Sequence, residues 1–525
     1  MKRFFAIPFP EQVNCFDRRG VQKQGPLPTA AALGMMVFLV ILCGEPASAH
    51  VGSPDVFLEG KAGPYKLFVT VRVPQVIPGI AQVEIRSESN QVSEIRIAPM
   101  QLTGPGSQFA PAPELTQRSD DDPQFFRGSL WLMEFGALQV RIEAAGSAGK
   151  GMLGVPIPAV AQRTLPMQRS LGLTLFALMM LLAWAMISIV VAAVREAKLP
   201  PGARAPAGGG RKARGAAAMA TLVVVAILIA GEFWWRADER WYASHIYTPP
   251  KIDARINANG QLLLRAAPMP LSSGNPRRPA DLVDFDHLAL DHEHLMHLFL
   301  IRRPGMDVFW HLHPERAGSG SFVQNLPSMP AGQYEIFADV VLSSGFPVTM
   351  VGQIDLPSAI NGQPLVGDDS GIDGLGAASN TTTEYSLAGG ERMVWEHDGY
   401  PLKSGVPLSL RFRVIDKSGN PAEDLEPYMG MAAHAAVLRS DGSVFAHIHP
   451  TGTVPMASFE LAQASLPSKG ELSHSSMDMS PMTRQKINPE ISIPYGFPNH
   501  GMYRIFVQVK RRGQIQTAFF DVEVN

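Results

Sequence analysis

Residues 171–194 form an apolar run of 24 residues without one charged side chain. A helix of that length can span the hydrocarbon core of a bilayer. A second run, residues 215–231, is shorter and is followed by the aromatic stretch FWWR, which is typical of a membrane–water interface. The two runs predict a transmembrane hairpin with helices over residues 170–194 and 215–235.

The segment between the two runs, residues 195–214, carries six basic residues and one acidic residue. By the positive-inside rule this loop lies in the cytoplasm, so both flanking regions lie in the periplasm of a bacterium, outside its inner membrane. Residues 1–49 combine a basic lead-in, an apolar run over residues 30–42 and a small-residue site at Ala47-Ser48-Ala49. This pattern predicts a signal peptide, with an uncleaved N-terminal anchor as the alternative.

Both cysteines of the chain, Cys15 and Cys43, lie inside this predicted signal segment. The rest of the chain then offers no disulfide and no thiolate ligand, so a metal site would use His, Met or carboxylate side chains. The formal net charge of −2 favours no nucleic-acid partner. The expected partners are the lipid bilayer and, in an alternative interpretation, another protein of the cell envelope.

The remainder of the chain has the pattern of short β-strands. Residues 50–165 contain alternating or apolar runs such as LFVTVRV (67–73) and AQVEIR (81–86), separated by Pro and Gly. This pattern predicts a β-sandwich of about 110 residues, by analogy with Ig-type domains of that size.

Residues 249–525 contain an internal repeat. The stretch HLFLIRRPGMDVFWHLHP (297–314) aligns with HAAVLRSDGSVFAHIHP (434–450), and a Gly-x-Tyr-x-Ile-Phe strand follows in both halves. Two separate motifs in the same order indicate a duplication. The expected fold is mainly β, with three Ig-like or cupredoxin-like β-sandwich domains plus the transmembrane hairpin. The predicted domains are residues 50–165, 249–356 and 386–525, with residues 357–385 as a linker.

Each repeat contains a His-x-His-Pro strand. Side chains at i and i+2 share a face of a strand, so each pair projects together, with Phe309 or Phe445 on the same face. A hairpin signal before each pair brings His297 near His311 or His313, and His434 near His447 or His449. The sequence therefore predicts one three-imidazole cluster per repeat, a ligand set that suits Cu(II) or Zn(II). The predicted ligands are His297, His311 and His313 in one site and His434, His447 and His449 in the other.

Two further stretches, DHEHLMH (291–297) and HSSMDMSPM (474–482), add histidines and methionines. The methionines have polar neighbours, unlike core methionines, and thioethers bind Cu(I). The second stretch resembles the Met/His-rich tracts of bacterial periplasmic copper-handling proteins. The alternative is a disordered loop with oxidisable methionines. The accessory candidates are His292, His294, His474, Met477, Met479 and Met482.

The repeats resemble uncharacterised bacterial membrane-anchored envelope β-sandwich modules with an HxHP strand, a resemblance that implies fold and location more than activity. Met296 stands where a zinc-protease HExxH helix needs its second histidine, and no catalytic constellation is recognised. The sequence thus predicts a non-enzymatic periplasmic metal-binding protein for metal handling or sensing, with copper first and zinc second. The alternative is a structural or interaction protein whose histidines serve the core.

Overall fold

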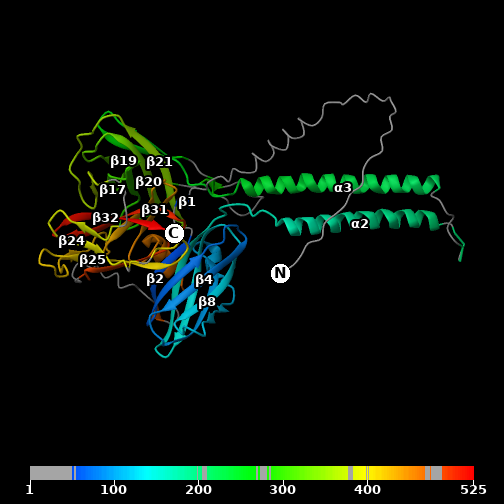
Figure 1. Ribbon diagram of the computed structural model, residues 1–525, viewed down its shortest axis with the longest axis horizontal. Coiled ribbons are helices and arrows are strands. Elements are labelled where there is room, and N and C mark those ends of the chain that lie inside the picture. Colours follow the sequence, from blue (N-terminus) through cyan, green and yellow to red (C-terminus); the bar gives the residue numbers. More distant parts are fainter. Residues whose placement is uncertain are drawn as a thin grey trace, which may run out of the picture. The chain divides into compact units, whose positions relative to one another are not determined.

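The computed structural model describes residues 50–51, 55–197, 199–200, 202–203, 210–267, 270–271, 281–282, 285–376, 382–397, 399, 401–466, 473–474 and 487–525. The predicted signal segment over residues 1–49 and the candidates Met477, Met479 and Met482 lie outside these ranges. In the described part the chain is mainly β, as predicted, with two long helices (Figure 1).

The first β region has two sheets that enclose one hydrophobic core. Every second residue of β4 is buried and the residues between them are exposed or half-buried, which is the pattern that predicted strands here. The first sheet contains, in order, β2 (Asp55–Ala62), β3 (Tyr65–Arg72), β4 (Gly79–Ser87), β8 (Phe125–Leu132) and β7 (Gln117–Arg118). The second contains β29 (Ser473–His474), β10 (Gly149–Ala159), β9 (Gly136–Gly146), β5 (Val92–Gln101) and β6 (Glu114–Leu115), and a short 3-10 helix η1 (Pro105–Gln108) follows β5.

The two long helices are α2 (Arg169–Glu196) and α3 (Arg211–Ala243), which lie side by side (Figure 1). Both are long and apolar enough to cross a membrane. At 1.5 Å per residue their 28 and 33 residues exceed the roughly 30 Å of a hydrocarbon core. Only 0% and 6% of their most apolar windows are buried by protein, so neither helix has the covering that a soluble core helix needs.

Residues 249–356, called module A from here on, form two sheets with the pair of short strands β13 (Pro270–Leu271) and β14 (Asp281–Leu282) beside them. The inner sheet contains β15 (Leu288–Ala289), β20 (Gly332–Leu342), β16 (His297–Arg303), β17 (Phe309–Leu312) and β22 (Ser370–Ile372), and β21 (Pro347–Leu356) pairs with β20. The outer sheet contains β11 (Ile252–Ile256), β12 (Gln261–Ala266), β19 (Ser321–Asn325) and β18 (Glu315–Gly318). Strand β22 comes from the predicted linker, which therefore also contributes to the sheet of module A.

Residues 386–525, called module B, form two sheets together with short flanking strands and the helix α4 (Met456–Ala464). The inner sheet contains β1 (His50–Val51), β28 (Val444–Ile448), β27 (His434–Arg439), β31 (Gly501–Arg511) and β26 (Leu425–Glu426), and β32 (Gln514–Val524) pairs with β31. The outer sheet contains β23 (Glu384–Ser386), β24 (Arg392–Trp395), β25 (Leu408–Ile415) and β30 (Glu490–Tyr495). The order β21-β20-β16-β17 in module A corresponds to β32-β31-β27-β28 in module B; the duplication itself stays a prediction.

The inner sheets of the two modules pack against each other. On β16, Leu298 and Leu300 point into the core of module A, whereas Phe299 and Ile301 belong to a separate apolar cluster with residues of module B. In that cluster two aromatic pairs stack across the modules, Phe309 on Phe506 at 4.2 Å and Phe337 on Phe445 at 4.1 Å between ring centroids. The predicted placement of Phe309 and Phe445 on one face with the histidines is confirmed.

The first β region also contacts module B. Strand β1 pairs with β28, the amide of Glu59 donates to the carbonyl of Thr451 at 2.8 Å, and Met456 and Phe459 of α4 belong to the first core. A fragment that began after the long helices would lose these contacts. The experiments below therefore use the full chain in detergent.

A buried ion pair of module B also bonds to the backbone of module A. Arg504 on β31 is fully buried and forms two bonds to Asp521, at 2.6 and 2.7 Å, while its Nη1 donates to the carbonyl of Met306 in module A at 2.8 Å. We expect Arg504→Met to lower the free energy of unfolding by about 3–5 kcal/mol, because the Asp521 carboxylate would stay buried without its guanidinium.

Urea unfolding followed by intrinsic fluorescence measures this change. The matched control is Arg392→Met, which removes an exposed pair with Glu384 (2.8 Å) and should cost less than about 1 kcal/mol. Equal losses in the two variants would contradict the prediction.

Candidate metal centre

Eight histidines meet where the inner sheets of modules A and B face each other, and we call them the histidine cluster. Their rings form a continuous set of contacts, including 4.8 Å between the centroids of His292 and His434 and 5.1 Å between those of His297 and His447. Module A contributes five members and module B three. The members are His292, His294, His297, His311, His313, His434, His447 and His449.

Six of these side chains fall into two groups of three. Within each group, one ring nitrogen per residue lies within 4.8 Å of the others, close enough for the three to bind one ion. The first triad consists of His297, His311 and His447, and the second triad of His292, His434 and His449. Each triad takes ligands from both modules.

This grouping differs from the one that the sequence predicts. The sequence assigns one triad to each repeat, because the i, i+2 rule places both histidines of an HxH pair on one face. In the structure each pair is divided: His447 belongs to the first triad and His449 to the second, while His313 joins neither. The physical reason is that the partner of each histidine face is the opposite inner sheet, so the nearest imidazoles come from the other module.

His313 instead stacks on His294, with ring centroids 3.9 Å apart and planes at 25°. Its Nδ1 lies 3.0 Å from Oδ1 of Asp369, and Nε2 of His294 lies 3.4 Å from Asp368. This stacked pair borders the first triad, since the ring of His313 lies 4.7 Å from that of His311. Of the other accessory candidates, His474 lies on β29, opposite Met152 of β10.

A turn before β16 brings His292 into the second triad. His292 and Glu293 have positive φ angles of 51° and 71°, and the backbone of Asp291 exchanges two hydrogen bonds with that of His294 at 2.8 and 2.9 Å. Left-handed backbone at residues other than glycine costs free energy and gathers at functional sites. No spacing rule predicts this turn from the sequence, so His292 could be named only as an accessory candidate.

Each member of the first triad has an outer partner. Nε2 of His297 donates to the carbonyl of Asp291 at 3.2 Å, Nδ1 of His311 donates to Oε1 of Gln508 at 2.8 Å, and Nδ1 of His447 lies 3.5 Å from Asp339. Metal-binding histidines have such partners on the ring nitrogen that does not bind the ion.

The inward nitrogens of His297 and His311 lie only 3.1 Å apart. With the outward nitrogens protonated, both inward atoms carry lone pairs and neither can donate to the other. A cation between them removes this conflict. Tyr428, whose hydroxyl lies 3.4 Å from Nδ1 of His311, closes this side of the triad.

In the second triad His434 and His449 are buried and His292 is half-buried, and most of the ring nitrogens are unpaired within the described residues. Nε2 of His292 and both nitrogens of His434 and His449 have no hydrogen-bond partner within the described residues. Each unpaired buried polar atom costs about 1–3 kcal/mol, so five such atoms in contact call for a ligand. Three imidazole nitrogens around one point fit a copper or zinc ion.

Burial keeps these rings neutral. Desolvation is the main cause that holds the pKa of five imidazoles well below the usual 6.5, and the neighbouring histidines lower each pKa further. Only a neutral imidazole can offer a nitrogen to a metal ion, so these five rings are in the metal-binding form at neutral pH. The five are His297, His311, His313, His434 and His449.

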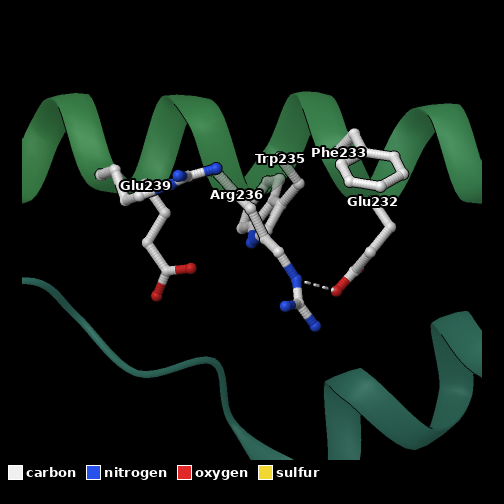
Figure 2. A pocket seen from close by; sticks show the side chains of 6 residues that line it. Glu232, Phe233, Trp235, Arg236 and Glu239 are labelled. Carbon is white, nitrogen blue, oxygen red and sulfur yellow. Dashed lines mark hydrogen bonds and ion pairs between the residues drawn. The ribbon is translucent and has the colours of Figure 1, made fainter.

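A separate hollow lies along α3, beyond its apolar run (Figure 2). It is lined by Phe233, Trp235 and charged side chains, among which Nε of Arg236 donates to Glu232 at 2.7 Å. Aromatic and charged residues at this place along a membrane helix are typical of the lipid–water interface. We therefore assign this hollow to the anchoring of the helices rather than to chemistry.

Comparison with known proteins adds little to the site. Residues 388–525 match a family model described as a domain of unknown function (DUF8832). No curated protein matches the chain.

Among solved structures, the chain is similar to latent PorU from Porphyromonas gingivalis, at 10% identity and a TM-score of 0.13, covering 90% of this chain and 34% of that one. E. coli alpha-2-macroglobulin is similar at 8% identity and a TM-score of 0.18, with 89% of this chain and 23% of that one covered. A Corynebacterium diphtheriae protein described as membrane anchored is similar at 9% identity and a TM-score of 0.14, with 90% of this chain and 94% of that one covered. The chain thus spans a third or less of the length of the first two, and all three TM-scores are too low to carry an argument.

Proposed function

We propose that this protein is a membrane-anchored periplasmic protein that binds metal ions in the histidine cluster, copper first and zinc second, for metal handling or sensing. The observation that carries the proposal is the pair of inward nitrogens of His297 and His311, 3.1 Å apart, with their outward nitrogens already bonded. The bound ion would supply a redox couple if it is copper and a structural link if it is zinc.

The proposed location rests on α2, α3 and the charge between them. The basic segment over residues 195–214 supports a loop in the cytoplasm of a bacterium, with the β regions in the periplasm. The corresponding strand orders of modules A and B support a duplication of one Ig-like or cupredoxin-like β-sandwich. In this arrangement the bilayer is the partner of the helices, and the modules carry the metal site.

The chemistry of the ligands supports copper or zinc. The described modules offer imidazoles and carboxylates, and no thiolate is available because both cysteines precede residue 50. Neutral imidazoles bind Cu and Zn well, whereas Ca²⁺ and Mg²⁺ prefer oxygen ligands. We propose no reaction for the site, and the role that we assign to it is binding and release.

In the alternative role, the protein binds a protein partner and its histidines belong to the core. This role requires that the buried histidines be hydrogen-bonded. Core histidines are hydrogen-bonded like other buried polar groups. The unpaired ring nitrogens of His434 and His449 do not meet that requirement. We therefore favour metal binding.

A metal titration of the untagged full chain in detergent tests the proposal. We expect saturable binding of two ions per chain for Cu(I), Cu(II) or Zn(II), measured by equilibrium dialysis and elemental analysis. A variant with His311→Ala and His434→Ala lacks one ligand of each triad and should lose both ions. The control His500→Ala removes an exposed histidine outside the cluster and should bind as the wild type does. Equal, weak binding by all three proteins would refute the proposal.

The two triads should differ in affinity. The first triad has an outer partner on every ring, whereas His434 and His449 have none among the residues that the structure describes. Such partners change metal affinity by about 10–100-fold. We expect the first triad to fill first and Gln508→Met to weaken that ion about tenfold while the second ion binds as before. Competition with a chelator of known affinity measures both constants, with Gln516→Met as the matched control. Unchanged affinity in Gln508→Met would contradict the assigned order.

A further inference from the structure

The two triads lie next to each other, and their ligand rings are in contact. His447 of the first triad and His449 of the second lie two residues apart on β28 and at its end, with ring centroids 4.4 Å apart. Three other ring contacts also join the triads, His434 with His447 at 5.7 Å, His292 with His297 at 6.0 Å and His311 with His434 at 6.4 Å. No other side chain is needed to bridge the two positions, because the ligand rings touch each other directly.

The contact sets an upper limit on the separation of two bound ions. An ion binds about 2 Å from its ligand nitrogen, so ions on His447 and His449 lie no farther apart than about 11 Å. Two paramagnetic ions at such a distance broaden each other's spectra. Two divalent charges at such a distance also repel each other in a site of low dielectric.

Carboxylates lie close to the outward nitrogens of several cluster rings, where their negative charge can offset this repulsion. Asp291 lies 3.8 Å from Nε2 of His297, and Asp339 lies 3.5 Å from Nδ1 of His447. Asp368 and Asp369 contact His294 and His313 of the stacked pair. Lys510, 4.0 Å from Asp368, offsets part of this charge.

The positions of the carboxylates are built into the fold. Oδ1 of Asp291 accepts the amide of Ala457 at the start of α4 at 2.8 Å, and Asp369 accepts the amide of His313 at 2.8 Å and Nε2 of Gln324 at 2.8 Å. Asp291 is buried and the other three carboxylates are half-buried, and carboxylates removed from water need compensating positive charge. Together with Lys510, these carboxylates leave a net negative charge that offsets most of the charge of two divalent ions.

We propose that the histidine cluster is one paired-ion centre, in which two copper ions bind close enough to sense each other, at the interface of modules A and B. This inference rests on the proposed function and adds that the two sites act as a unit. Neither module can build either site alone, because the first triad needs His447 from module B and the second needs His292 from module A. Loading the centre therefore ties the modules together.

Electron paramagnetic resonance of the full chain in detergent tests the pairing. At one equivalent of Cu(II) we expect the spectrum of an isolated ion. At two equivalents we expect dipolar broadening of the spectrum and a half-field transition. A variant with His434→Ala and His449→Ala keeps the first triad and should show only the isolated spectrum at every loading. The variant His449→Gln, which keeps a polar side chain of similar size, repeats the test if the double variant does not fold.

The outcomes separate the two proposals. Two bound ions whose spectrum is simply twice that of one ion would overturn the pairing and leave metal binding intact. A single bound ion in the wild type would also overturn the pairing. Absence of saturable copper binding, with His500→Ala behaving alike, would overturn the proposed function as well.

Discussion

Lowering the pH from 7.5 to 5.5 should reduce the free energy of unfolding of the metal-free protein by several kcal/mol. Burial holds the pKa of five cluster imidazoles well below 6.5, so they take up protons only when the chain unfolds. Below pH 6.5 the unfolded state therefore binds more protons, and stability falls as the pH falls. Each group loses about 1.4 kcal/mol by pH 5.5, which sets a ceiling of about 7 kcal/mol for five groups.

The charged groups that face these rings are the carboxylates of Asp291, Asp339, Asp368 and Asp369. Burial raises the pKa of Asp369 above its usual 3.8. Asp369 therefore raises the free energy of unfolding as the pH falls, because protonation in the folded state removes a buried charge. The histidines outnumber it, so the net slope keeps its sign.

Urea unfolding at pH 7.5, 6.5 and 5.5 in the presence of a chelator measures the slope. A variant with His434→Asn and His449→Asn should show a shallower dependence, because it lacks two of the five groups. His397→Ala, which removes a histidine outside the cluster, should keep the wild-type slope. Stability that is constant between pH 7.5 and 5.5 would show that the cluster is charged or solvated when the protein is folded.

Saturation with Zn(II) should raise the melting temperature by about 8–16 °C for each occupied triad. An ion at a thousand times its dissociation constant stabilises the folded state by about 4 kcal/mol, because the unfolded chain does not hold three imidazoles together. For a unit of 150–250 residues, 1 kcal/mol corresponds to about 2–4 °C. The two ions should also oppose separation of the modules, since each triad has ligands in both.

Differential scanning calorimetry of the full chain in detergent checks this expectation, and a chelator should reverse the shift. The variant with His311→Ala and His434→Ala should melt at the same temperature with and without Zn(II). Mg²⁺ serves as the ion control, because it prefers oxygen ligands in octahedral geometry. An equal Zn(II) shift in wild type and variant would place the stabilising ion outside the cluster.

The local elements and the candidate ligands could be predicted from the sequence. A run of 24 uncharged residues predicted a helix long enough for a membrane, and α2 covers it. The strand period placed Phe309 and His311 on one face, and that face points away from the core of module A. All eight members of the histidine cluster were among the predicted ligands or accessory candidates, because HxH pairs and a preceding histidine recur in the sequence.

The grouping of the histidines into triads depends on how the modules pack and could not be predicted from the sequence. The period of a strand sets the face of a side chain but not the sheet that lies opposite, so His447 could not be assigned to the triad of His297 and His311. The partners Gln508 and Asp339 were equally out of reach, because each lies more than one hundred residues from the ring that it contacts and belongs to no motif. Contacts between modules depend on packing of the apolar faces, and that packing is a property of the whole fold.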